Sequence, residues 1–221
     1  MVQINIHTHH HIKDGNLQVV NLFSQNLSDI NPDYLFSTGI HPWHIQKVNL
    51  NDCYRNLERS IGMKNMIAVG ECGLDRSIEL DFALQEKCFK VQIEIANEHA
   101  KPLIIHCVRS YSDLIRIKKE TKSEVPWIVH GYMASHQTTK QLISHGFFFS
   151  VGEKLLNAIS KHEIFRSIPI DRLILETDNH QISISQIYDQ ASSILKIDNE
   201  ILSESILRNF NTIFGTHKIE K

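Results

Sequence analysis

Val2-Gln-Ile-Asn-Ile6 alternates apolar and polar residues and leads directly into His7-Thr-His9. Such alternation predicts a strand with one buried face, and residues two apart on a strand point to the same side. His7 and His9 therefore aim the same way, as two ligands of one cation must. His9 with His11 is an alternative pair, but the register of the strand favours His7 with His9.

Four further apolar runs end at or just before a side chain of a metal-binding type. These are Met66-Ile-Ala-Val69 before Glu71, Pro102-Leu-Ile-Ile105 before His106, Trp127-Ile-Val129 before His130 and Leu173-Ile-Leu175 before Asp178. Three more runs resemble strands without a ligand, namely Leu17–Leu22, Tyr34–Thr38 and Phe147–Val151. Each candidate ligand thus lies at the carboxyl end of a predicted strand.

Segments with helical periodicity lie between many of these runs. Asp81–Ala100 places apolar residues three or four apart, and Ile187–Leu195 and Ile201–Phe214 have a similar pattern. Eight strands that mostly alternate with helices predict an α/β fold, a parallel TIM barrel of the (β/α)8 type. The step from the first strand to the second, at 11–16, is too short for a crossover helix, which needs about ten residues. We therefore expect an abbreviated first unit.

Length and composition indicate one domain without a membrane span. At 221 residues the chain is short for such a barrel, so we expect a single domain over residues 1–221. It contains no run of about 18 apolar residues and begins with a strand rather than a signal peptide, which indicates a cytoplasmic protein. The four cysteines lack CxxC spacing and are expected to be free thiols. The net charge of −2 neither proposes nor excludes DNA as a partner.

The types of ligand indicate the chemistry. Imidazoles and carboxylates suit zinc, manganese or iron(II), and a carboxylate can bridge two cations about 3.5–4 Å apart. A pair of such cations activates water and polarises a phosphoryl or carbonyl oxygen. Asp178 could both bind a cation and accept the proton of that water. The set predicts a hydrolase.

Six short motifs follow one another along the chain: Ile4-Asn-Ile-His-Thr-His9, Ser37-Thr-Gly-Ile-His-Pro-Trp43, Val69-Gly-Glu-Cys-Gly-Leu-Asp75, Ile104-Ile-His-Cys107, Ile128-Val-His-Gly131 and Leu175-Glu-Thr-Asp178. In this order they resemble the signatures of the TatD-like metal-dependent hydrolases, which include deoxyribonucleases. The segment Asn209-Phe-Asn-Thr-Ile-Phe214 is similar to the closing helix of the family. Any one motif is weakly specific, but six in the same order are highly specific.

The resemblance implies an amidohydrolase-type TIM barrel that cleaves phosphodiester bonds with two divalent metal ions, zinc, magnesium or manganese. One ion would be held by His7, His9, Glu71 and Asp178, and the other by Glu71, His106 and His130. Glu71 would bridge the two ions, and with Asp178 it is the expected catalytic residue. The expected partner is DNA or another phosphodiester, with action at DNA ends or on single strands, and a monomer is favoured.

Substrate contacts are expected from residues near the ligands. His41 matches the Gly-x-His-Pro element of the family and would contact a phosphate, as would Arg109, unless Arg109 pairs with Asp113. Arg76 would orient the substrate together with Asp75, unless Asp75 only caps a turn. Trp43 and Tyr132 would stack on a base or else cover the edge of the core.

Two departures from the family pattern lie beside the candidate ligands. Asn5 replaces the usual Asp, and Asn179-His-Gln181 follows Asp178 where the family commonly has Pro-Tyr-Leu. One alternative is therefore a PHP-type phosphoesterase, in which His180 would hold a third metal. The other is a catalytically weak, metal-stabilised scaffold that binds a nucleic acid or a protein.

Overall fold

Eight strands follow one another in one sheet in the order of the chain, from β1 to β8. The computed structural model describes residues 2–27, 30–31 and 33–215. The strands are β1 Ile4–Thr8, β2 Leu17–Phe23, β3 Leu35–Gly39, β4 Met66–Asp75, β5 Leu103–Val108, β6 Trp127–Val129, β7 Phe147–Val151 and β8 Leu173–Leu175. The pair β1–β2 is parallel, as are β3–β4, β4–β5 and β7–β8. A parallel bridge from Thr8 to Asp178 places the first strand beside the segment after the last, the order of a (β/α)8 barrel.

Helices separate most of these strands. The α-helices are α1 Leu50–Ser60, α2 Phe82–Glu98, α3 Tyr111–Glu120, α4 His136–Ser144, α5 Lys154–Asn157, α6 His162–Arg166, α7 Ile184–Leu195 and α8 Asn199–Phe214. Short 3-10 helices lie at η1 Pro42–His44, η2 Ile159–Lys161 and η3 Ile170–Arg172. The segment between β1 and β2 has no helix, which confirms the predicted abbreviation of the first unit.

The chain forms two compact units. Unit 1 comprises the described residues of Met1–Val20 and Val129–Lys221, and unit 2 is Asn21–Ile128. Unit 1 therefore contains β1, β7, β8 and helices α4 to α8, whereas unit 2 contains β3, β4, β5 and helices α1 to α3. The strands β2 and β6 run from one unit into the other along the chain.

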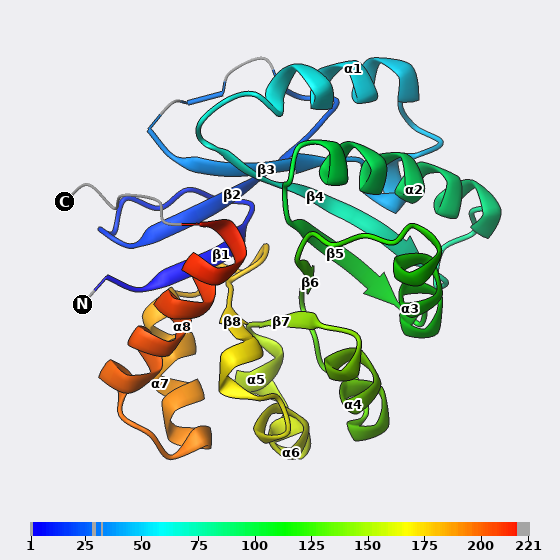
Figure 1. Cartoon of the computed structure of the whole chain (residues 1–221). Helices are drawn as coiled ribbons and strands as arrows, with labels where there is room; N and C mark the ends of the chain where they lie inside the picture. The colour runs from blue at the N-terminus through cyan, green and yellow to red at the C-terminus, as the bar shows by residue number, and fades with distance from the viewer. Residues whose placement is uncertain (1, 28–29, 32, 216–221) are drawn as a thin grey trace. The chain divides into compact units, whose positions relative to one another are not determined.

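In unit 2, α2 lies along β4 (Figure 1). The helix begins after Asp81, whose side chain accepts a hydrogen bond from Ala83 N and so satisfies a backbone donor of the first turn. Its buried face brings Phe89 edge-on to Trp127, with ring centroids 5.5 Å apart. This packing gives β4 and β5, which both carry candidate ligands, a rigid apolar backing.

In unit 1, α7 and α8 lie side by side (Figure 1). A capping box formed by Ser183 and Gln186 starts α7. The buried Tyr188 of this helix accepts a hydrogen bond of 3.0 Å from the backbone N–H of Ile4, at the start of β1. The strand that carries His7 is thus fixed to the helix layer of its own unit.

The four cysteines, all within the described residues, are free, as predicted, and all four are buried. Burial raises the pKa of the Cys88 thiol to about 11 and that of Cys107 further still. Both thiols are therefore protonated at neutral pH and serve as small apolar groups.

Candidate metal centre

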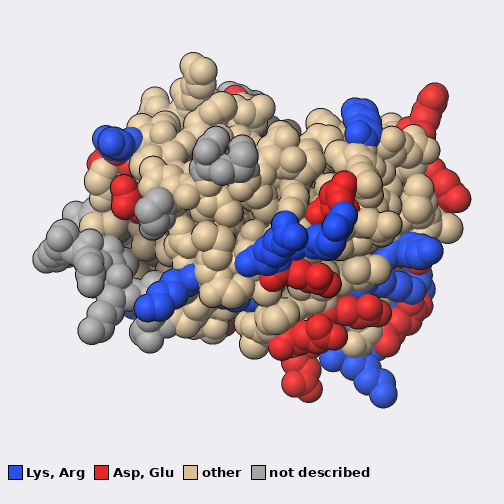
Figure 2. Space-filling view, turned by 90° about the horizontal axis from the view of Figure 1, so that it is seen from above, with Lys and Arg blue, Asp and Glu red and all other residues tan. Residues whose placement is uncertain are grey.

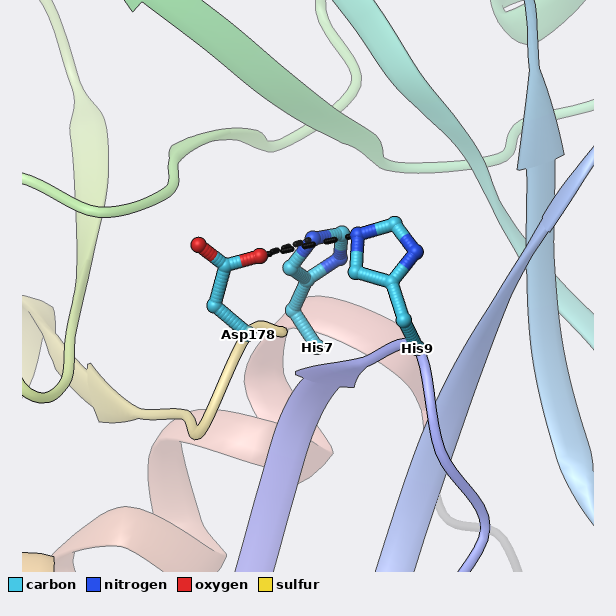
Figure 3. A group of neighbouring side chains, drawn as sticks. All are labelled: His7, His9 and Asp178. Atoms are coloured by element: carbon cyan, nitrogen blue, oxygen red, sulfur yellow. Dashed lines mark ion pairs between the residues drawn. The ribbon is translucent and has the colours of Figure 1, made fainter. Parts of the chain in front are cut away.

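Unit 1 contains one cluster of two imidazoles and a carboxylate, formed by His7, His9 and Asp178. Figure 3 shows both rings directed at Asp178, and their Nε2 atoms lie 3.6 and 3.5 Å from its Oδ1. One candidate ligand atom from each residue lies within 4.8 Å of the other two. The structure thus brings together the His-x-His pair that the strand register favoured, whereas His11 is exposed.

The backbone around Asp178 is fixed by β1. Asp178 N donates to His7 O at 2.9 Å, and His9 N donates to Asp178 O at 3.1 Å. Asp178 has a φ of +55°, in the left-handed region that costs free energy for residues other than glycine and recurs at functional sites. Burial raises the pKa of the Asp178 carboxyl, but the two imidazoles outweigh this effect and hold the pKa well below its usual value. The carboxylate is therefore ionised at neutral pH, the form that binds a cation.

Asn5, at the position where the family usually has an Asp, joins β1 to the segment before Asp178. Its amide nitrogen donates to Thr177 Oγ1 at 2.8 Å, and its amide oxygen accepts from Thr177 N at 3.0 Å. Both residues are buried. The amide thus makes two hydrogen bonds to Thr177, one as a donor and one as an acceptor, and these connect β1 to the segment before Asp178.

His130 lies in unit 1 beside a carboxylate that the sequence reasoning missed. Its Nδ1 is 3.5 Å from Oε1 of the buried Glu176, and its ring centroid is 4.6 Å from that of His7. The same oxygen of Glu176 accepts a hydrogen bond from Gly131 N. Glu176 stands two residues before Asp178, a spacing that could have indicated a second carboxylate near the same site.

Unit 2 contains a second cluster of two imidazoles and a carboxylate, formed by His41, Glu71 and His106. Glu71 Oε1 lies 3.1 Å from His41 Nε2 and 2.9 Å from His106 Nδ1. Burial lowers the pKa of His41, and Glu71 only partly offsets this effect, so the ring favours its neutral form. The resemblance assigned His41 to a substrate phosphate, but the structure places it, 5% exposed, against the candidate ligand Glu71.

Asp75 completes the surroundings of His106. Its Oδ2 is 3.0 Å from His106 Nε2 and accepts a hydrogen bond of 2.7 Å from Trp43 Nε1. A neutral imidazole has one N–H and cannot donate to both Glu71 and Asp75. A cation between His106 Nδ1 and Glu71 would remove this conflict, with Nε2–H donating to Asp75, an arrangement typical of histidines that bind metals.

Each cluster thus fits a divalent cation by its donors. Two imidazoles and one carboxylate are the protein ligands of many catalytic zinc and iron(II) sites, which keep further positions open for water or substrate. Four of the six predicted ligands, His7, His9, His130 and Asp178, lie in unit 1, and the other two, Glu71 and His106, lie in unit 2.

The remaining predicted substrate contacts have different positions. Arg76 is exposed, and its guanidinium pairs with Asp113 at 2.9 Å and covers the ring of Phe82. Asp113 is the residue that the sequence had offered as a partner for Arg109. Arg109 is exposed and has a φ of +54°. Tyr132 is fully buried and shares a hydrogen bond of 2.9 Å with Thr139 Oγ1, so it lies in the core.

His180, the possible third-metal ligand, lies 2.6 Å from Glu153 through its Nε2 atom. It belongs to none of the potential metal-binding groups found among the described residues. The neighbouring Asn179 contacts His10 Nε2 at 3.0 Å. Two of the three residues that depart from the family pattern after Asp178 thus contact other residues of unit 1, His10 and Glu153.

The sequential strand order and the clusters of histidine and carboxylate define a (β/α)8-barrel metal-dependent hydrolase. A family model described as TatD related DNase matches residues 11–215, and the chain belongs to this family. Within the residues that the structure describes, no helix is both long and apolar enough to cross a membrane.

Two named relatives show how far the similarity extends. The metal-dependent hydrolase BU355 of Buchnera aphidicola, itself uncharacterized, is 28% identical over 202 residues, which cover 81% of this chain and 76% of that protein. The 3'-5' ssDNA/RNA exonuclease TatD of Pantoea ananatis is 27% identical over 161 residues, which cover 70% of this chain and 62% of that protein. The chain spans 58% and 55% of two further metal-dependent hydrolases, from Buchnera aphidicola and Escherichia coli K12.

The solved structure of YjjV, a TatD homolog from Escherichia coli K12, superposes with a TM-score of 0.85 at 18% identity. The superposition covers 97% of this chain and 98% of that chain. At this identity the likeness establishes the fold, and it confirms the TIM barrel predicted from the sequence.

Proposed function

We propose that this metal-dependent hydrolase cleaves phosphodiester bonds in DNA, at ends or in single strands, with two divalent metal ions. The observation that carries the proposal is that each compact unit contains its own cluster of two imidazoles and a carboxylate. His7, His9 and Asp178 would hold one ion, and Glu71 and His106 would hold the other. The bridging role of Glu71 and the role of His130 as a ligand stay predictions from the family resemblance.

The phosphodiester substrate is supported by the name of the family and by the relatives named as exonucleases. The charges of the surface do not provide a general attraction for nucleic acid. Acidic and basic side chains are interspersed over the face seen in Figure 2, and the whole chain has a net charge of −2. A nucleic acid would therefore be held locally, at the metal centre and by a few nearby side chains.

The residues of the chain have distinct tasks in this chemistry. Divalent cations, when bound, polarise a water molecule and stabilise negative charge on a phosphoryl oxygen. Asp178 is ionised, and its Oδ1 faces both imidazoles, so we assign its Oδ2 to accept the proton of the attacking water. Asp75 would hold the His106 ring with Nδ1 toward Glu71.

A nuclease assay with Mg²⁺, Mn²⁺ or Zn²⁺ tests this proposal. The substrates are single-stranded DNA, blunt and overhanging duplexes, RNA and a phosphomonoester. The Asp178→Asn variant should lose at least about 100-fold in kcat, within the range of general-base contributions. Asp171→Asn, the same change at an exposed position of η3, is the matched control and should retain full activity.

Two results would contradict the proposal. Equal activity of Asp178→Asn and the wild type would exclude the assigned proton acceptor. If no phosphodiester is cleaved with any of the metals, the binding-scaffold alternative or another substrate class would be favoured.

A further inference from the structure

Trp43 has an unusual combination of exposure and fixed orientation. It lies in η1, directly after β3, and is 51% exposed. Among the exposed large hydrophobic residues of the described chain, it is the one aromatic side chain. Exposure of the apolar indole ring to water costs free energy, and covering the ring with a ligand would recover it. An exposed tryptophan that is held in one orientation therefore indicates a binding role.

Contacts within unit 2 hold the indole in place. Trp43 Nε1 donates to Asp75 Oδ2 at 2.7 Å, and Asp75 itself is fully buried. The Trp43 backbone N–H donates to His41 Nδ1 at 3.1 Å. The indole meets the rings of His41 and His106 edge-on, with centroids 5.0 and 5.8 Å away. Because its rotamer is already fixed, the ring would lose little conformational entropy when a ligand stacks on it.

A pocket of about 270 Å³ adjoins the indole at the same end of β3 and β4. Its lining is mostly apolar, with one basic and one acidic side chain, and consists of Pro42, Trp43, Gln46, Lys47, Ile78, Glu79 and Leu80. The volume is slightly below the roughly 300 Å³ at which pockets for drug-sized ligands begin. It therefore suits one ring-sized group, with the Lys47 ammonium available for an adjoining anion.

We propose that Trp43 and this pocket bind one unpaired nucleobase of a single-stranded nucleic acid, beside the nucleotide that is hydrolysed. The contact with His106 places the indole next to a candidate metal ligand, where the substrate would be hydrolysed. The inference therefore rests on the proposed function. Bases present flat π-faces that stack on tryptophan regardless of sequence. In a duplex these faces are covered by neighbouring bases, so the site selects single strands and frayed ends.

The test combines removal of one base with substitution of Trp43. Phosphorothioate-linked octathymidylate, which resists hydrolysis, is compared with versions that lack a single base at successive positions. Loss of a stacked base costs about 1–3 kcal/mol, so one position should weaken binding to the metal-loaded wild type at least about fivefold. The same removal should change binding to Trp43→Ala by less than about twofold.

Trp43→Phe is the matched variant. Phenylalanine keeps a face for stacking but loses the N–H that bonds Asp75, so this variant should retain most of the dependence on the base. Fluorescence gives a second readout, because Trp127, the other tryptophan, is fully buried. Oligonucleotide binding should quench the emission of Trp43, and the abasic version should quench it less.

The outcomes separate this inference from the proposed function. If base removal weakens binding equally in the wild type and in Trp43→Ala, or if no oligonucleotide binds, the nucleobase site is overturned. Cleavage of DNA without dependence on the base would overturn the site and leave the proposed function intact. Dependence on the base without cleavage by any metal-loaded form would support the site and contradict the proposed function.

Discussion

Gly73 should be the least replaceable of the glycines that position the candidate ligands. It lies in β4 between Glu71 and Asp75 and pairs with His106 of β5. Its φ is +138°, and a Cβ built there would lie 2.0 Å from the carbonyl oxygen of His106. That distance is more than 1 Å shorter than ordinary van der Waals contact, and the obstructing atom belongs to the backbone, which cannot rotate away.

The expected cost of Gly73→Ala has two parts. A non-glycine residue in such a backbone conformation costs about 1–3 kcal/mol. Pushing β5 away from β4 costs roughly a further 1–3 kcal/mol, the range for overpacking in a core. We expect a loss of about 3 kcal/mol or more, which for a chain of this length lowers Tm by roughly 6–12 °C.

Substitutions at two other glycines distinguish the conformational cost from the steric cost in a thermal or urea unfolding experiment. Gly146 has a φ of +73° and no atom within 4 Å of its built Cβ, so Gly146→Ala should show only the conformational cost, about 1–2 kcal/mol. Gly62 has open space and no positive φ, so Gly62→Ala should be close to neutral. A Gly73→Ala variant no less stable than Gly146→Ala would refute the steric argument.

Two further predictions concern pH and metal. Burial lowers the pKa of Lys118 to about 8, so between pH 8 and 10.5 the unfolded state binds more protons and stability rises with pH. The stability of Lys118→Met relative to the wild type should therefore be highest below pH 8 and fall as the pH rises toward 10.5, and urea titrations that show a constant difference would contradict this. Removal of divalent metal with a chelator should lower Tm reversibly, because an ion at 100 times its Kd stabilises the folded state by about 2.7 kcal/mol. An unchanged Tm in calorimetry would count against a resident metal.

The strand pattern was readable from the sequence because apolar runs and their spacing reflect burial directly. β7 and β8 have the predicted bounds, and α2 differs from its predicted segment only at the ends. β4, by contrast, was predicted to end before Glu71 but continues to Asp75. Its pairing with β5 extends through Asp75 and Val108, a long-range interaction that local composition does not reveal. The expectation of a single domain stays a prediction.

The metal-ligand side chains of the candidate site could be predicted from the sequence, but the groups that contact these side chains could not. The sequence indicated His106 as a ligand, but not that carboxylates lie against both of its ring nitrogens. Glu71 and Asp75 are four residues apart, a spacing that keeps side chains on one face of a strand, so this pair was accessible to the same reasoning. The exposure of Trp43 and the burial of Tyr132 could not be predicted from the sequence, because both depend on how loops and helices pack around the strand ends.

The reciprocal hydrogen bonds between Asn5 and Thr177 also affect tolerance to acid. This link between β1 and the segment before Asp178 consists of an amide, a hydroxyl and a backbone N–H. None of these groups titrates in the acidic range, whereas an aspartate at position 5 would gain a proton near its ordinary pKa of about 3.9. Acid therefore leaves these two hydrogen bonds intact and acts on this part of the site through the carboxylate of Asp178, which the neighbouring imidazoles hold in its ionised form.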